Sequence, residues 1–305
     1  MDAQTPLERG RSSAWSANDF FLLHLAVSAV DLNEHANAQS LQRGVLQIAG
    51  ATDFKTAALQ TSTPVRVWMK DAAFTRSATG WKLTAHADSI GIDFDLIESL
   101  PPVLHGAAGE EGLSRKGPRP GQASYYYSVP FLKTTGALDF KQHRGIKIIS
   151  GRSWMDHEFG SNQLAAEQAG WEWFSIHLDD GRALMLYVLR NKDGSIEPRS
   201  SGSWIEKDGR ATHLARADFE LSPGRKWTSP HSGIEYALDW KIKIPSVKAG
   251  LELRAAMDDQ EFNAEKSTGL NYYEGAARIS GQVGGAPVTG GGYLEITAGT
   301  LGGRL

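Results

Sequence analysis

The chain has 305 residues, of which 41% are apolar and 22% are charged, and its formal net charge is −3. This composition supports ordinary globular cores and excludes a disordered chain. The small negative charge and the lack of a long basic run argue against nucleic acid as a partner. The sequence has no cysteine, which rules out disulfides, thiolate metal sites and cysteine nucleophiles, and its nine tryptophans favour aromatic-lined interiors.

The first apolar segment, FFLLHLAVSAV at residues 20–30, imitates a secretory signal peptide with an apolar body and a small-residue ending. Asp19 stands directly before this body and His24 interrupts it, so we interpret the segment as a buried strand. No apolar run reaches the roughly 18–20 residues of a membrane-spanning helix, and we do not expect the chain to span a membrane. We expect a cytoplasmic protein as the chain stands, or a periplasmic or secreted one if an upstream signal was removed.

Short and largely alternating apolar segments follow along the chain, and each predicts a β-strand. These segments are residues 65–70, 81–87, 90–100, 145–151, 236–245, 251–257, 276–283 and 292–299. Turns such as Asp180-Gly181 and Asp208-Gly209 separate them. Helical periodicity is scarce, and residues 41–51 and 164–169 are the best short candidates for helices. Many short strands with frequent glycine turns predict an all-β protein made of sandwiches or barrels.

A loop rich in glycine, proline and charge covers residues 106–122, where no regular element is expected. A loop of this length inside a compact unit is typically functional or disordered. Three consecutive tyrosines, beginning at Tyr125, follow it at once. A boundary near residues 150–165 separates two groups of strands, and their similar patterns indicate two related barrels, although no residue-level repeat establishes this.

The most informative segment places Asp156, His157 and Glu158 side by side. In a strand, Asp156 and Glu158 share one face and His157 lies on the other. If Trp154 or Trp171 desolvates one of the carboxyls, its pKa rises and it becomes able to donate a proton near neutral pH. A buried and fully hydrogen-bonded polar cluster is the alternative interpretation.

The next segment, WEWFSIHL at residues 171–178, carries Trp171, Trp173, Ser175 and His177 on one strand face. Two indoles, a hydroxyl and an imidazole on one face favour a lined ligand cavity over a dry core. The outside of a barrel at an interface has a similar composition, so this alternative stays open.

The sequence gives little support for metal or cofactor chemistry. The scattered histidines form no HxH or HExxH motif, so we expect no metal site. No GxSxG, Walker A or strand–helix GxGxxG motif is present, and we expect no cofactor. Near the C-terminus, Tyr272 and Tyr273 precede Glu274, and this aromatic pair either lines a cavity rim or packs across strands.

Taken in order, several segments resemble the AttH/carotenoid 1,2-hydratase family, also called hydroxyneurosporene synthase-like. They are residues 21–31, 103–106, 123–128, 151–161, 170–190, 259–261, 272–281 and 292–297. The resemblance implies two lipocalin-like antiparallel β-barrels packed together, with few short helices and a ligand cavity in or between them. We expect the N-terminal barrel in residues 1–155 and the C-terminal barrel in residues 156–305. Related members include carotenoid and isoflavonoid hydratases and fungal enzymes of intramolecular cycloaddition.

Two departures from the family pattern matter. Nothing before Phe20 matches the Trp/Tyr-rich strand that usually opens the family, and an incomplete first barrel would expose a strand edge and favour a homodimer. The hydratase branch carries a carboxylate on the strand that reads LMLYVLR here, at residues 184–190. Tyr187 matches that strand but no acid does, which leaves Asp156 or Glu158 as substitute acids.

We therefore expect an enzyme that hydrates, cyclises or isomerises an elongated, apolar, unsaturated small molecule of isoprenoid or polyene type. The alternatives are a non-catalytic carrier of a hydrophobic ligand and a structural protein in which the central motif ties two barrels together. The predicted catalytic residues are Asp156, His157 and Glu158. The predicted substrate-binding residues are Tyr126, Trp171, Trp173, His177, Tyr187 and Tyr273.

Overall fold

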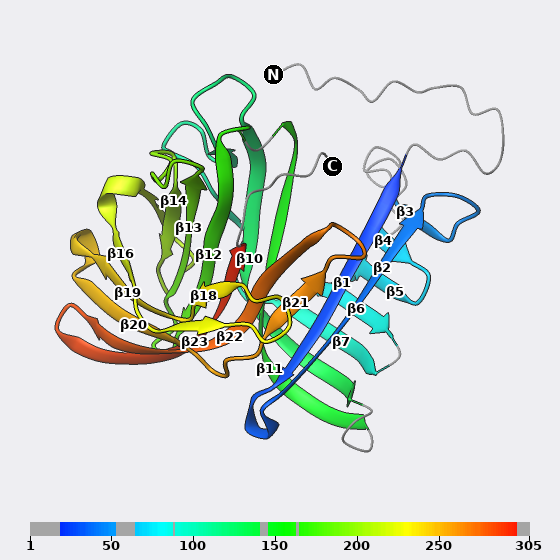
Figure 1. The fold of residues 1–305 in the computed structure, drawn as a ribbon. Helices are drawn as coiled ribbons and strands as arrows, with labels where there is room; N and C mark the ends of the chain where they lie inside the picture. Colours follow the sequence, from blue (N-terminus) through cyan, green and yellow to red (C-terminus); the bar gives the residue numbers. More distant parts are fainter. Residues whose placement is uncertain (1–18, 53–64, 88, 141–145, 163–164, 298–305) are drawn as a thin grey trace.

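The computed structural model describes residues 19–52, 65–87, 89–140, 146–162 and 165–297, and these residues form an all-β, lipocalin-like fold. Helical structure in this part of the chain consists of short 3₁₀ turns, η1 (Val30–Leu32), η3 (Arg216–Asp218) and η4 (Pro245–Val247). No helix in these ranges is long and apolar enough to cross a membrane. The described residues form two large antiparallel sheets and two hairpins (Figure 1).

The first large sheet has the strand order β11-β10-β7-β6-β5-β4-β3, and β8 and β9 also pair with β10. Its described strands are β3 (Ala49–Ala51), β4 (Arg66–Met69), β5 (Ala72–Arg76), β6 (Gly80–His86), β7 (Ile90–Glu98), β8 (Val103–Leu104), β9 (Leu113–Arg115), β10 (Ala123–Phe140) and β11 (Ile146–Asn162). The loop of residues 106–122 is irregular as predicted, except that it contributes β9. This short strand forms because its backbone pairs with the start of β10.

The second large sheet has the order β15-β14-β13-β12-β23-β22-β20-β19-β16, with β21 paired to β22. Its described strands are β12 (Gln168–Leu178), β13 (Ala183–Asn191), β14 (Ser201–Ile205), β15 (Ala211–Ala215), β16 (Glu220–Pro223), β19 (Asp239–Ile244), β20 (Ala249–Ala255), β21 (Glu261–Ala264), β22 (Leu270–Val283) and β23 (Ala286–Thr297). A small hairpin joins β17 (Lys226–Thr228) and β18 (Glu235–Ala237). The sheets change between β11 and β12, and the division of the chain into units 1–155 and 156–305 stays a prediction.

A long hairpin, β1 (Phe20–Ala29) with β2 (Glu34–Arg43), crosses the first sheet (Figure 1). The segment that imitates a signal peptide is therefore a strand, as predicted. It is only partly buried, because Leu25 packs against Ile90 and Ile92 of β7 while Phe20 and Leu22 are exposed. The hairpin thus covers part of the first sheet and leaves its own outer end open.

Each other segment predicted as a strand contains a strand, and residues 145, 298 and 299 of those segments fall outside the described residues. Residues 236–245 differ from the prediction, because they are divided between the end of β18 and β19, which lie in different sheets. The two predicted helices are wrong where the structure describes them. Residues 41–51 finish β2, turn through Leu46 and Gln47 with φ of 51° and 58°, and enter β3. Residues 165–169 form a turn and the start of β12.

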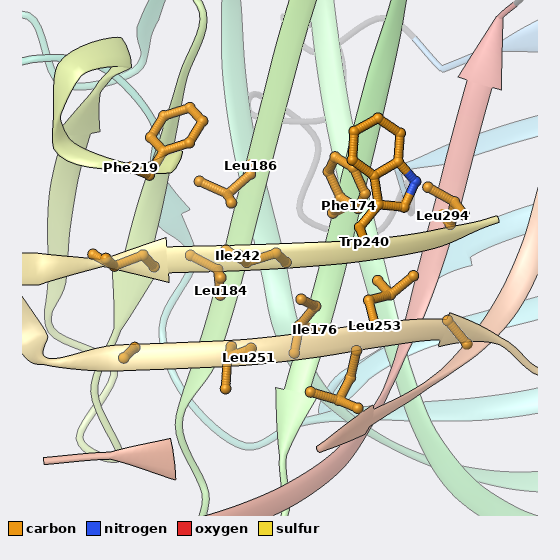
Figure 2. Packing of buried hydrophobic residues seen from close by; sticks show 14 of the residues in the cluster. Phe174, Ile176, Leu184, Leu186, Phe219, Trp240, Ile242, Leu251, Leu253 and Leu294 are labelled. Carbon is orange, nitrogen blue, oxygen red and sulfur yellow. The ribbon is translucent and has the colours of Figure 1, made fainter. Parts of the chain in front are cut away.

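The inner face of the second sheet holds the largest apolar core (Figure 2). Phe174 and Ile176 of β12 point into this core, where they contact Leu184 and Leu186 of the neighbouring strand β13. The Phe174 ring packs edge-on against Trp240 of β19, with ring centroids 5.3 Å apart. Burying such a side chain contributes about 1.5–3 kcal/mol. This packing fixes the orientation of β12, so its alternate side chains face the first sheet.

Candidate functional site

The candidate site lies where β10 and β11 of the first sheet meet β12, β13 and β23 of the second (Figure 1). A smaller cavity of about 260 Å³ is lined by Lys116, Tyr126, Asp156, Glu158, Trp171, Trp173, Tyr187, Leu189 and Glu295. A larger cavity of about 660 Å³ is lined by Arg152, Ser153, Trp154, Asp156, Trp173, Ser175, His177, Glu274, Ala276, Ala277, Gly291, Gly292, Tyr293 and Glu295. The two cavities adjoin, because Asp156, Trp173 and Glu295 line both.

Asp156 is open to both cavities and is held by three hydrogen-bond donors. Trp154 donates its indole N–H to Oδ1 over 2.7 Å, the Tyr126 hydroxyl donates to Oδ2 over 2.9 Å, and the Ser128 hydroxyl donates to Oδ1. These bonds favour the carboxylate, but desolvation by the surrounding protein outweighs them and raises the pKa of Asp156 to about 6. The geometry therefore gives a carboxyl that can hold and release a proton near neutral pH.

A chain of hydrogen bonds behind Ser128 fixes its hydroxyl. His105 is buried, with Nε2 2.6 Å from Ser128 Oγ and Nδ1 2.9 Å from Ser203 Oγ of β14. Burial, reinforced by Lys116, lowers the pKa of His105 to about 3, so its ring is neutral. Since Ser128 donates its only proton to Asp156, it accepts from Nε2–H, and Nδ1 accepts from Ser203. The chain thus gives Asp156 a donor of fixed direction.

Glu158 lies two residues further along β11 and is paired with Lys116, whose Nζ is 2.8 Å from Oε1. The Ser124 hydroxyl also donates to this carboxylate. The Lys116 side chain is only 7% exposed, and its ammonium lies 4.0 Å from the ring centroid of Tyr187 and 5.1 Å from that of Tyr126. The loop of residues 106–122 therefore supplies an ion-paired cation to the wall of the smaller cavity.

The aromatic residues of β12 form the wall between the sheets. Trp173 donates its indole N–H to the Tyr126 hydroxyl over 2.9 Å, and Trp171 donates to a Glu295 carboxylate oxygen. His177 lines the larger cavity and bonds the Pro130 carbonyl through Nε2. Burial lowers the pKa of His177, which favours the neutral form of this ring. The alternation predicted for residues 171–178 is present, with the two indoles on the cavity side.

Tyr187 belongs to the same cavity and comes from β13. Its hydroxyl lies 2.8 Å from Ser114 Oγ and accepts a hydrogen bond from the Ser201 hydroxyl over 2.9 Å. Its ring packs under the Lys116 ammonium. Tyr187 is therefore held in place in the wall of the smaller cavity.

Two of the predicted residues lie away from this site. His157 points to the opposite face of β11, where its Nδ1 is 3.0 Å from the Tyr127 hydroxyl and its ring packs against Phe159. Tyr273 is buried in the core of the second sheet, where its hydroxyl donates to the Met257 carbonyl over 2.9 Å. Successive side chains of a strand point to opposite faces. Asp156 and Glu274 face the cavities, so their neighbours His157 and Tyr273 point away from them.

Several site residues were not anticipated from the sequence, namely His105, Lys116, Ser128, Glu274, Tyr293 and Glu295. The segment GYLEIT did hold a signal for two of them. Its period of two places Tyr293 and Glu295 on one face and buried Leu294 and Ile296 on the other. An acid that alternates with core residues in this way belongs to a lined cavity or a buried polar network.

The residues that the structure describes contain no group of three or more His, Asp or Glu side chains placed to hold a metal ion. The polar lining of the two cavities consists of carboxyls, a lysine, an arginine, a histidine, hydroxyls and indoles. This composition can bind, orient and protonate a small molecule with the chain's own side chains.

Fold and site together define a lipocalin-like all-β protein with an aromatic and carboxyl-lined cavity between its sheets. A sequence model of the AttH-like family matches residues 1–299, and the chain belongs to this family. A crystal structure of a protein assigned as an AttH, from Nitrosomonas europaea, is 30% identical, with a TM-score of 0.77 over 91% of this chain and 81% of that chain.

Two more distant structures share the fold. Kievitone hydratase from Nectria haematococca is 18% identical, with a TM-score of 0.72 over 92% of this chain and 81% of that chain. CghA in complex with Sch210972 is 12% identical, with a TM-score of 0.55 over 88% of this chain and 78% of that chain. No curated protein sequence matches the chain.

Proposed function

We propose that the protein is an enzyme that protonates an elongated, apolar, unsaturated small molecule and completes its hydration, cyclisation or isomerisation. The observation that carries this proposal is Asp156, an accessible carboxyl with a pKa of about 6 among Trp154, Trp173 and Tyr126. A proton donor whose pKa lies near the operating pH is well matched to general acid catalysis. An apolar substrate that displaces cavity water would raise this pKa further and favour the protonated donor.

The proposed reaction begins when Asp156 transfers its proton to one carbon of a double bond and leaves a cation on the other carbon. The rings of Trp171, Trp173 and Tyr187 face the same space and stabilise the cation through their electron-rich faces. Water ends the reaction as a hydration, an internal nucleophile ends it as a cyclisation, and loss of a different proton ends it as an isomerisation.

The shape and polarity of the two cavities support a substrate with a long apolar body and a polar group. The cavities adjoin at Trp173, which suits a ligand longer than either cavity. The ion pair of Lys116 and Glu158 at one end offers a donor and an acceptor to a hydroxyl or carbonyl. The occurrence of this fold in a protein named kievitone hydratase supports hydration as one outcome.

One observation favours a second candidate function, a carrier of a hydrophobic ligand. The Asp156 carboxylate already accepts three hydrogen bonds, an arrangement that also serves a purely structural carboxylate. A carrier uses the same aromatic cavity without chemistry.

Mass spectrometry of compounds captured from polyene and terpenoid extracts separates the two functions. We expect the folded protein to retain a compound whose mass rises by one water on prolonged incubation, or whose ultraviolet absorption changes at constant mass. Asp156→Asn should abolish hydration, cyclisation and isomerisation alike, because each begins with the Asp156 proton, and Asp208→Asn in an exposed turn is the matched control. Retention of a compound that never changes would establish the carrier and overturn the enzyme.

A further inference from the structure

Opposite Asp156, the wall of the cavities carries a pair of carboxyls from the second sheet. Glu274 of β22 and Glu295 of β23 are direct cross-strand partners in the antiparallel ladder. Both line the larger cavity, and Glu295 also lines the smaller one together with Asp156 and Glu158. Directly opposed side chains in such a ladder lie within contact distance of each other.

The surroundings of this pair stabilise one negative charge but not two. Trp171 donates its indole N–H to Glu295, and the Tyr293 hydroxyl bonds Glu274. None of the ion pairs within the described ranges involves either carboxyl. Lys116 and Arg152 are the cations that line the cavities, and they are paired with Glu158 and Asp179. The other titratable groups that face the pair are Asp156, Glu158, Tyr272 and His177.

Two adjacent, partly buried carboxyls without a cation hold one proton between them. Burial and the neighbouring carboxylate raise the pKa of Glu274 well above its ordinary value, and burial raises that of Glu295. The pair therefore favours a state with one proton and one negative charge, and the charged carboxylate is able to accept a proton.

We propose that the Glu274–Glu295 pair is the second proton-transfer group of the site, with Glu295 acting as the general base for the water that adds to the substrate. This inference rests on the proposed function. Asp156 and Glu295 line the same two cavities from different sheets, so a double bond held between Asp156 and Glu295 meets a proton donor on one side and a proton acceptor on the other.

The atoms balance in this scheme. The π electrons of the double bond form a C–H bond with the Asp156 proton, which leaves the Asp156 carboxylate and a carbon cation. An oxygen lone pair of water forms the C–O bond, and one water proton passes to Glu295, so the glutamate pair becomes neutral. The product is an alcohol, and cavity water returns the proton from Glu295 to Asp156 for the next turnover.

The shared proton is tested without a substrate by an NMR titration of isotope-labelled glutamate carboxyls in the full-length protein. We expect the wild type to show two coupled carboxyls that titrate above the ordinary glutamate range. Glu274→Gln should replace the two coupled steps with a single step at Glu295, because the amide cannot take up a proton. Glu220→Gln on exposed β16 is the control and should change neither carboxyl. Two glutamates that titrate independently in the ordinary range would overturn the inference.

The catalytic part is tested with the captured compound that the wild type hydrates. We expect Glu295→Gln to lower the hydration rate by about 100-fold or more while the captured amount stays unchanged. Hydration at the wild-type rate in Glu295→Gln would overturn this inference and leave Asp156 as the acid of the proposed function. If the wild type cyclises or isomerises a compound but hydrates none, this inference fails and the proposed function stands. If the wild type changes no compound at all, both fail.

Discussion

At Asp156, hydrogen bonding and desolvation act in opposite directions on one carboxyl. Three donors stabilise the charged form, while the surrounding protein disfavours it, and desolvation is the larger of the two effects. The result is a folded-state pKa of about 6 against an ordinary value of 3.8. The folded protein therefore binds this proton more tightly than the unfolded chain does.

A first prediction follows for stability. The raised pKa of Asp156 adds to the free energy of unfolding. This addition is fully present below about pH 4 and is lost as the pH rises through 6. Asp156→Asn should therefore raise the free energy of unfolding above pH 6 by about 1 kcal/mol, a value reduced because cavity water screens the charge. Thermal unfolding should show a Tm about 2–4 °C above wild type at high pH and no difference near pH 4. Asp208→Asn, the exposed control, should shift Tm at neither pH.

Ser128 gives a second prediction at the residue scale. Ser128→Ala removes a hydrogen-bond donor to Asp156 and breaks the chain that links Asp156 to His105. The carboxylate then loses stabilisation, so the pKa of Asp156 should rise above 6. The alkaline limb of the pH–rate profile should move to higher pH, because the acid stays protonated longer. Ser153 also lines the larger cavity but bonds Thr134 and not Asp156, so Ser153→Ala is the control and should leave the alkaline limb in place. A shift to lower pH in Ser128→Ala would contradict the assigned direction of this hydrogen bond.

At the scale of elements, β12 and β23 position the site because each presents one face to a core and the other to the cavities. Gly291 of β23 lies on the cavity side, and a Cβ built there meets only the Ala277 carbonyl oxygen, at 4.0 Å. The missing side chain thus keeps part of the larger cavity open.

Filling this space is a third prediction. Gly291→Phe should reduce the amount of captured compound by about 10-fold or more, because the ring occupies the larger cavity. Its Tm should stay close to that of the wild type, since a strand position with free space tolerates a β-favouring residue. The control is Gly250→Phe on β20, where the added side chain also meets open space. Undiminished capture by Gly291→Phe would show that the ligand lies elsewhere.

Strand alternation explains how much of the fold and the site the sequence could predict. It located most strands and placed Asp156 and Glu158 on one face and Trp171 and Trp173 on another. It failed at residues 41–51, where apolar spacing resembled a helix, because pairing of β3 with β4 decides that structure. It also could not show that Glu295 and Asp156 line the same cavities, since the approach of two strands from different sheets is set by tertiary packing.

At the scale of the whole molecule, the first sheet ends in two edge strands, β3 and β11, within the described residues. Near the start of β11, Ile146 and Ile148 are 69% and 84% exposed. An apolar edge of this kind is a template for another strand. We propose that two copies of the chain associate through the β11 edge.

Sedimentation velocity tests this fourth prediction. We expect the wild type to sediment as a dimer and Ile148→Lys as a monomer, because a charge on the edge opposes strand addition. Val67→Lys is the control, since Val67 is also exposed but lies on β4 between two paired strands. A wild type that stays monomeric at high concentration would contradict the proposed dimer.

In the proposed reaction, Asp156 delivers a solvent-derived proton to a substrate carbon between the two sheets. This transfer is tested most directly by incubating the protein and its captured compound in deuterium oxide and measuring carbon-bound deuterium in the compound by mass spectrometry. We expect incorporation of one deuterium by the wild type and by Asp208→Asn, and none by Asp156→Asn. A compound that is retained by the wild type without gaining carbon-bound deuterium would contradict it.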